Sequence, residues 1–530
     1  MCRKAAGMGR LRHWGRLRHL GCLPALAGML LVGGCMVGPD FERPDAPILD
    51  NWGKGANLPV DSRTGFTSRS AHSVPWWHVF GDETLNSLIA EAYRQNVGLQ
   101  AAGVRVYQAR AQLGIARGEL FPQVQEIKGG AKSIRFSAKD PFIRDLERVG
   151  LVNDHITRVD AGFDAGWEID VWGKIRRDVQ SADANLKASL ASYDDALVTL
   201  TGDIAATYVT VRELQQLIAA ARRNAGLQKT SLDLTKLRLD NGVATRLDVN
   251  EATVLYNNTL ANIPGYEAEL AQAYNALSVL VSEAPGGMKT RLGGRARFPG
   301  VPAEVAVGVP ADMLRRRPDI RYAEYVAAAQ SAQIGVAKAD LFPAFSISGA
   351  IGVRADDFAN LFDNGTTAGF INPGFSWNFL NYGRIRNNVR VQDAKFQEAL
   401  LSYENTVLSA YSEVENALTG FLRAKQQAVY LRRSLRAAHA AVSEVDAQYE
   451  DGTASYNRVV DAQKSLLVAE ERLIAAQASV LTSLIAVYKG LGGGWMPDNV
   501  KGLISEKTRQ QMAERTRWGE LLAKPVEEAG

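Results

Sequence analysis

Thiols, imidazoles and glycine-rich turns are the groups in this sequence that could support catalysis or bind metal ions or phosphate. The six histidines never take zinc-ligand spacing such as H-E-x-x-H, and no nucleophile elbow occurs. The glycine-rich segment 490–494 lacks the lysine and spacing of a phosphate-binding loop, which favours a helix end. The triple arginine 315–317 could bind phosphate or lipid, but Pro318 suits the first position of a helix and favours a structural role. The sequence therefore predicts neither an enzyme nor a bound cofactor.

Cys35 is the side chain for which the sequence predicts a covalent modification. It ends the segment LVGGC, residues 31–35, which resembles a bacterial lipobox and follows the basic and apolar stretches of a secretory signal. We therefore expect residues 1–34 to be removed and Cys35 to carry acyl chains at the new N-terminus. The alternative is a plain signal peptide with an incidental cysteine. Met36 in place of aspartate favours delivery to the outer membrane.

The mature chain predicted in this way is nearly neutral. Removal of residues 1–34 leaves 55 basic and 57 acidic side chains, a net charge of −2. A nucleic-acid partner thus gains no electrostatic support. Cys2 and Cys22 lie in the removed segment, so no disulfide can form within the mature chain. No run of 18 apolar residues follows residue 35, which leaves β-strands as the means of crossing a membrane.

An internal duplication organises the sequence. Residues 113–122 (LGIARGELFP) recur at an offset of 221 as residues 334–343 (IGVAKADLFP). Trp167 with the segment WGKIR at 172–176 recurs at an offset of 210, as Trp377 with YGRIR at 382–386. The offset then stays at 210 through the turn dipeptides Asn241-Gly242 and Asp451-Gly452. A constant offset indicates that the two halves contain elements of equal length.

Each half is predicted to contain a helix, two strands and a long helical hairpin. The first helices span about 83–118 and 312–340, and a Phe-Pro pair ends each. Residues 173–241 lack proline and show apolar residues at helical spacing, which predicts a helix of roughly 100 Å at about 1.5 Å per residue. Helices of such length imply a coiled-coil-like assembly.

The helices that follow the turn dipeptides return along the first ones. They are expected at about 245–282 and 455–490, because the turn glycines accept positive φ. Pro264 lies inside the first of them. We expect it to kink or break that helix.

The predicted strands alternate between apolar and small or polar residues. Phe163, Trp167 and Ile351 belong to the apolar set, and the strand after Pro122 is the least regular. Four strands cannot close a barrel, which needs about eight or more, so several subunits must pool their strands. The alternation then fits a lipid-facing exterior and a watery lumen. The alternative is a soluble β-sandwich.

The chain resembles the TolC-like outer membrane factors, specifically the NodT-type lipoproteins of resistance-nodulation-division efflux systems. The resemblance covers roughly residues 35–495 and rests on several blocks rather than one motif. The most specific block is Pro310 with LRRRPDI at 314–320. The others are CMVGPDF at 35–41, PWW at 75–77, Trp167-Glu168 with Gly173-Lys174, DAQ at 461–463, and LGGGW at 491–495.

This resemblance implies a mainly α fold with a small transmembrane β part, as a trimeric α/β barrel with four strands per chain. It implies a homotrimer in outer membrane lipid that works with a periplasmic adaptor protein and an inner-membrane resistance-nodulation-division transporter. The chain would be a passive, gated duct that exports small solutes or drugs. No cofactor is implied apart from the covalent lipid on Cys35.

The boundaries expected from the duplication and the resemblance divide the chain into ten parts. In order, these are a signal peptide (1–34), a lipid-anchored equatorial segment (35–82), the helix of repeat 1 (83–121), outer-membrane β-hairpin 1 (122–171), periplasmic helical hairpin 1 (172–283), an equatorial linker (284–311), the helix of repeat 2 (312–342), outer-membrane β-hairpin 2 (343–381), periplasmic helical hairpin 2 (382–491), and a C-terminal equatorial tail (492–530).

The periplasmic turns are the candidate gate. In the family, acidic residues there form a constriction, and Asp461 occupies a matching position. This chain departs from the family one turn earlier, where it has Arg458. The duplication aligns Arg458 with Asp248 and Asp461 with Glu251. We hypothesise that Arg458 pairs with Asp248 or Glu251 of a neighbouring helix and holds the tip closed. The alternative is a solvated turn.

Two other functions remain open from the sequence. One is an outer-membrane duct for type I protein secretion, coupled to an ABC-type exporter. The other is a lipid-anchored periplasmic scaffold that never spans the membrane. Lipidation and the triple arginine favour the solute pump, and the alternating strands argue against the scaffold.

Overall fold

The computed structural model describes residues 36–45, 52, 66–67, 75–137, 139, 141–150, 155–294, 297–307, 315–493 and 502–523. Two compact units are distinguished, each built from separate stretches of the chain. Unit 1 contains the residues up to Phe41, Gly114–Ala182 and Ala329–Phe396. Unit 2 contains Glu42–Leu113, Asp183–Ala328 and Gln397 onward.

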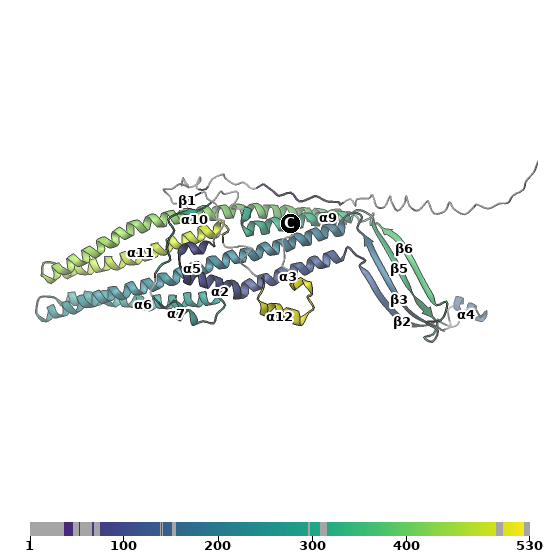
Figure 1. Ribbon diagram of the computed structural model, residues 1–530, viewed down its shortest axis with the longest axis horizontal. Coiled ribbons are helices and arrows are strands. Elements are labelled where there is room, and N and C mark those ends of the chain that lie inside the picture. Colours follow the sequence, from purple (N-terminus) through teal and green to yellow (C-terminus); the bar gives the residue numbers. More distant parts are fainter. Residues whose placement is uncertain are drawn as a thin grey trace, which may run out of the picture. The chain divides into compact units, whose positions relative to one another are not determined.

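Unit 1 contains a four-stranded antiparallel sheet (Figure 1). Its strands lie in the order β2 (Val124–Arg135), β3 (His155–Ile169), β5 (Ala344–Ala355) and β6 (Thr367–Ser376). The short helix α4 (Pro141–Arg148) lies in the connection between β2 and β3. Because β3 and β5 pair in the middle, the hairpins of the two halves join into one sheet.

The larger helices form two sets (Figure 1). The first set is α2 (Glu83–Gln95), α3 (Val97–Gly118), α5 (Lys174–Asp240) and α6 (Arg246–Leu280). The second is α9 (Pro318–Ala339), α10 (Arg384–Glu450) and α11 (Tyr456–Gly490). Helix α2 is the member of the first set without a counterpart among the described helices of the second. The smaller elements are β1 (Phe66–Thr67), which pairs in parallel with β4 (Val305–Ala306), η1 (Trp76–Phe80), α7 (Gly287–Leu292), α12 (Glu506–Arg515) and α13 (Glu520–Ala523).

Equal element lengths confirm the predicted duplicated fold class. Both α5 and α10 have 67 residues, α6 and α11 have 35 each, and α3 and α9 have 22 each. The second strands differ, with 15 residues in β3 and 10 in β6. The change of offset between the halves therefore falls in the β-hairpins, where insertions are tolerated best.

Two details of the predicted helices are wrong. The single helix expected over 83–118 is divided at Asn96, whose side-chain oxygen accepts from Leu99 N at 2.7 Å and so starts a second helix. The break predicted at Pro264 does not occur, because α6 continues through it, and the alternative of a kink stays a prediction. Pro264 and Gly265 are exposed, so water can satisfy the carbonyl group that the proline leaves without a donor.

The segment after Trp495, predicted as part of a C-terminal equatorial tail, contains the helices α12 and α13 in its described residues 502–523. Ile504, Met512 and Leu522 are buried in a cluster with Tyr107 of α3. Ser505 Oγ donates to Gln100 Oε1 at 2.7 Å. The tail therefore packs against the helix of the first repeat.

Among the described helices, α11 is apolar and long enough to span a bilayer by composition. Its best 18-residue window has a mean hydropathy of 1.4, and 61% of that window is buried inside the protein. Leu466, Leu481 and Leu484 are nearly inaccessible to solvent. The burial is that of a core helix, because a lipid-facing helix would expose these side chains.

Candidate functional site

One face of the four-stranded sheet is apolar, as the alternation predicted. The register places Phe163 opposite Ile351 and Trp167 opposite Ile347, and directly opposed residues share a face. Phe163 is 42% exposed and Ile351 is 61% exposed. Phe375, opposite Phe345, continues the same face into β6. A contiguous exposed apolar surface marks contact with lipid or protein.

The other face of the sheet carries charged and small side chains. Lys128 Nζ lies 2.8 Å from a Glu126 carboxylate oxygen and 2.9 Å from Asp164. Lys128, Asp160, Asp164 and Arg354 line a hollow of about 720 Å³ on this face. Charged side chains are costly to bury in lipid, so this face is suited to contact with water.

Both edges of the sheet are open. In the part of the chain that the structure describes, β2 and β6 each have one strand neighbour. Pro373 lies within β6 and has no N–H to donate, a substitution that an edge strand tolerates. A long, unpaired edge with an apolar face needs further strands to complete it.

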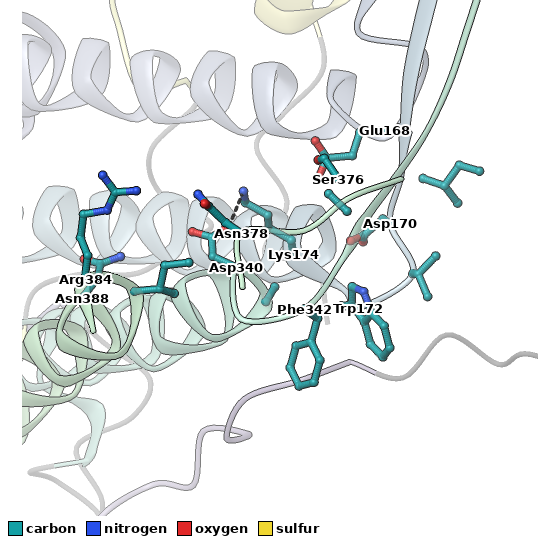
Figure 2. Close-up of a pocket in the computed structure, with 15 residues that line it drawn as sticks. Glu168, Asp170, Trp172, Lys174, Asp340, Phe342, Ser376, Asn378, Arg384 and Asn388 are labelled. Atoms are coloured by element: carbon teal, nitrogen blue, oxygen red, sulfur yellow. Dashed lines mark ion pairs between the residues drawn. The ribbon is translucent and has the colours of Figure 1, made fainter. Parts of the chain in front are cut away.

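A cavity of about 580 Å³ lies where the strands pass into the long helices (Figure 2). Lys174 Nζ lies 2.7 Å from Asp340 Oδ1 on its wall. The Trp172 and Phe342 rings stack with centroids 4.7 Å apart, and Trp172 Nε1 donates to Pro343 O at 2.7 Å. Tryptophan is enriched at membrane boundaries and at protein interfaces, because one end of its side chain is apolar and the other polar.

The duplicated motifs meet in equivalent ways at this junction. Trp167 Nε1 donates to Leu120 O at 3.3 Å, and Trp377 Nε1 donates to Leu341 O at 3.1 Å. Each tryptophan therefore fastens the second strand of its hairpin to the end of the helix before it. The repeated residues that the sequence singled out hold the sheet to the helices in both halves.

The four candidate gate residues all lie near the turns of the helical hairpins. Asp248 forms a capping box with Thr245, whose backbone N donates to Asp248 Oδ2 at 2.8 Å. Arg458 Nη1 donates to Gln448 Oε1 at 3.3 Å within its own hairpin. The Glu251 carboxylate faces the side-chain amide of Asn457. The predicted pair between Arg458 and Asp248 or Glu251 of a neighbouring helix stays a prediction.

Asp461 begins the second turn of α11. Its backbone oxygen accepts from Ser465 Oγ at 2.7 Å. Its position on the constriction also stays a prediction. Cys35, the predicted lipidation site, lies outside the described residues.

A cluster that the sequence did not predict joins the two hairpins at their tips. Leu232, Ala252, Val459 and two tyrosines are buried together there. Tyr449 and Tyr456, which flank the Asp-Gly turn, form an edge contact with centroids 5.3 Å apart. The position of these tyrosines beside the turn could have indicated a role at the tip. Their partners in the first hairpin, Leu232 and Ala252, lie about 200 residues away in the sequence, so the cluster itself could not be predicted.

Arg238 ties the first hairpin to this cluster. Its Nη2 donates to Glu450 O at 2.6 Å, and its guanidinium lies 4.5 Å from the centre of the Tyr449 ring. Burial raises the pKa of Tyr456. The tips are held within one chain by an apolar core, by the Arg238 hydrogen bond to Glu450 O and by the cation–π contact with Tyr449.

Comparisons with known proteins agree with these features. A sequence model of the family described as outer membrane efflux protein matches residues 88–282 and 309–493, which is more than half of the chain. Nodulation protein T of Rhizobium leguminosarum bv. viciae is 30% identical over 475 residues, which cover 89% of this chain and 93% of that protein. The probable efflux pump outer membrane protein TtgC of Pseudomonas putida is 28% identical over 466 residues, with coverages of 88% and 94%.

A solved structure shares the fold. The outer-membrane channel OprN matches with a TM-score of 0.79 and 31% sequence identity, over 87% of this chain and 100% of that one. Both helical hairpins and the sheet lie within residues 88–282 and 309–493, which the family model matches.

Proposed function

Because the chain belongs to the outer membrane efflux protein family, we propose that it is the outer-membrane channel of a tripartite efflux pump. In this role it is a passive, gated duct that carries small solutes or drugs across the periplasm and the outer membrane. Relatives named as efflux pump outer membrane proteins support this class of activity. The duct contributes a path, and the energy comes from an inner-membrane partner.

The sheet is the observation on which the proposal depends most. One chain supplies four strands with two open edges, an exposed apolar face and a charged face. Closure of a barrel needs about eight or more strands, so copies of the chain must pool theirs. A homotrimer meets this need, with the apolar face toward lipid and the charged face toward the lumen.

The remaining assignments follow from this arrangement. The hairpins α5–α6 and α10–α11 form the periplasmic tube, whose tips meet a periplasmic adaptor and a resistance-nodulation-division transporter. Cys35 carries the acyl chains that anchor the mature N-terminus in the outer membrane. Proteins that are anchored and also span with strands reside stably in the bilayer.

The test uses protein purified from outer membranes. Native mass spectrometry should give a trimer, and the trimer should conduct ions in planar bilayers. A deletion strain should accumulate a fluorescent dye that the wild-type strain exports. A monomer without conductance would contradict the proposal. Normal dye export combined with loss of a secreted protein would favour type I secretion instead.

Replacing Arg458 by alanine is expected to raise single-channel conductance, because it removes the cation that holds neighbouring acids at the tip. Each partly exposed pair contributes only about 0–1 kcal/mol, so the change should widen the constriction and raise the conductance without unfolding the protein. The matched control is Arg246→Ala, which removes an exposed arginine at the start of α6. Equal conductance in Arg458→Ala and wild type would remove the lock hypothesis.

A further inference from the structure

The first described residues of the mature chain are held against the sheet-to-helix junction by a set of hydrogen bonds. Val37 N donates to Trp172 O at 3.0 Å. Arg177 of α5 donates from Nε to Val37 O at 3.1 Å and from Nη2 to Gly38 O at 3.2 Å. Its Nη1 lies 2.9 Å from Asp40 Oδ1. All these residues belong to unit 1.

Arg177 suits this position because of its buried, forked head. Its residue surface is only 3% exposed, so each N–H needs a partner inside the protein. The two carbonyl groups, Asp40 and Gln180 supply those partners. A lysine could not replace it, because its ammonium group is a single compact charge and lacks the separate N–H groups that donate to the two carbonyl oxygens.

Glycines let the segment approach closely. Gly38 has φ of +104°, which L side chains rarely adopt. A Cβ on Gly335 of α9 would lie 2.8 Å from both Val37 O and Arg177 Cγ. A Cβ on Gly173 would lie 2.6 Å from Met36 Cγ. The segment therefore lies in a close-fitting seat with helix backbone on one side.

The duplication supplies an internal comparison for this seat. Gly335 is equivalent to Gly114, yet a Cβ added to Gly114 would meet no atom within 4 Å among the described residues. Arg177 is equivalent to Asn387, which cannot provide the same cationic fork. The seat is thus present at one of the two repeated junctions. A chain has one N-terminus but two repeated junctions. A seat for the N-terminal segment is therefore expected at only one of them, as observed.

We propose that Arg177 and Gly335 form a seat that fixes the mature N-terminus, and with it the acyl group, at the sheet-to-helix junction. The part of this proposal that concerns the acyl group depends on the proposed lipidation of Cys35. Because Cys35 directly precedes Met36, its Cα lies about 3.8 Å from that of Met36, the first residue in the seat. The stacked Trp172 and Phe342 lie at the same junction. The seat thereby places the anchor at the boundary where the sheet enters the bilayer, beside one repeat only.

The experiment places a nitroxide on the exposed segment through Pro39→Cys in the full-length protein from outer membranes. The label attaches uniquely, because Cys35 is acylated and the other cysteines lie in residues 1–34. Its mobility is compared with Gly335→Ala and with the matched Gly114→Ala. Both changes raise helix propensity equally, so only contact with the seat distinguishes them.

We expect several-fold faster label motion in Gly335→Ala and wild-type motion in Gly114→Ala. Arg177→Ala should also free the label, whereas Arg176→Ala, one residue away and bound to Asp170, should not. Detergent-resistant trimer is measured in each sample to show that the protein is folded. An immobile label in both seat variants, or equal effects of the two glycine changes, would overturn the proposal.

A second arm separates the seat from the lipid. Cys35→Ser behind a cleavable, non-lipoprotein signal yields a chain without acyl groups. The seat predicts that its Pro39→Cys label stays immobile, although Cys35→Ser removes the anchor. A mobile label there would show that the acyl chain holds the segment, and it would contradict the seat. Mass spectrometry of the N-terminal peptide tests lipidation separately, so its failure is distinguishable.

Discussion

Ile351→Lys is expected to abolish the detergent-resistant trimer and to remove the protein from the outer membrane. Ile351 lies within β5 on the apolar face, opposite Phe163, and is 61% exposed. A lysine facing lipid near the middle of the bilayer costs about 2–4 kcal/mol, and each subunit of a trimer would carry one. The measurement is the fraction of protein that migrates as unheated trimer from isolated outer membranes.

The matched control is the adjacent residue, Ala350→Lys. Ala350 lies opposite Asp164, so its side chain belongs to the charged face. A lysine there stays in water beside a carboxylate, and the trimer should form as in wild type. Its conductance should become less selective for cations, because a positive charge is added to the face that is proposed to line the lumen. Equal loss of trimer in both variants would contradict the assignment of the two faces.

The regular parts of the fold could be predicted because their signals are local and repeated. The period-two alternation around Phe163 and Ile351 fixed which residues share a face, and the strand register agrees. The constant offset between the halves predicted that the helices of the two hairpins have equal lengths, and they do. The strand after Pro122 was hardest to predict because the face of β2 that carries Ile127 also carries Gln125, Gly129 and Ser133, so apolar residues do not alternate regularly along it.

The parts that could not be predicted depend on partners far away in the sequence. Asn96 divides a helix by capping, and its side-chain amide is held in place by Leu280 O at 2.8 Å, 184 residues away. Met512 lies in a polar segment and is buried only because Tyr107 of α3 receives it. In the sequence, Arg177 cannot be distinguished from the exposed cations of a long helix. Its burial depends on hydrogen bonds to residues 37 and 38, about 140 residues earlier in the chain.

Arg317→Ala is expected to lower the free energy of unfolding of unit 2, which contains Arg317 and its partners. Arg317 is 8% exposed, and its Nη1 donates to Gly490 O at 2.6 Å at the end of α11. Its Nη2 lies 2.8 Å from carboxylate oxygens of both Asp319 and Glu413. It therefore joins the start of α9 to α10 and to α11. Loss of hydrogen bonds to charged groups costs roughly 1.5–3 kcal/mol, and the partial exposure of both acids keeps the loss within that range.

The neighbouring arginines decide between a structural and a ligand-binding role for the triplet. Arg315 and Arg316 are exposed, so Arg315→Ala and Arg316→Ala should change stability by no more than about 0.5 kcal/mol. The temperature at which the trimer dissociates should fall in Arg317→Ala and stay near the wild-type value in the other two. Were the triplet a phosphate or lipid site, the exposed pair would matter most. A larger fall in Arg315→Ala or Arg316→Ala, reversed by added phosphate or anionic lipid, would therefore contradict the structural role, because a buried tie between helices gains nothing from an external anion.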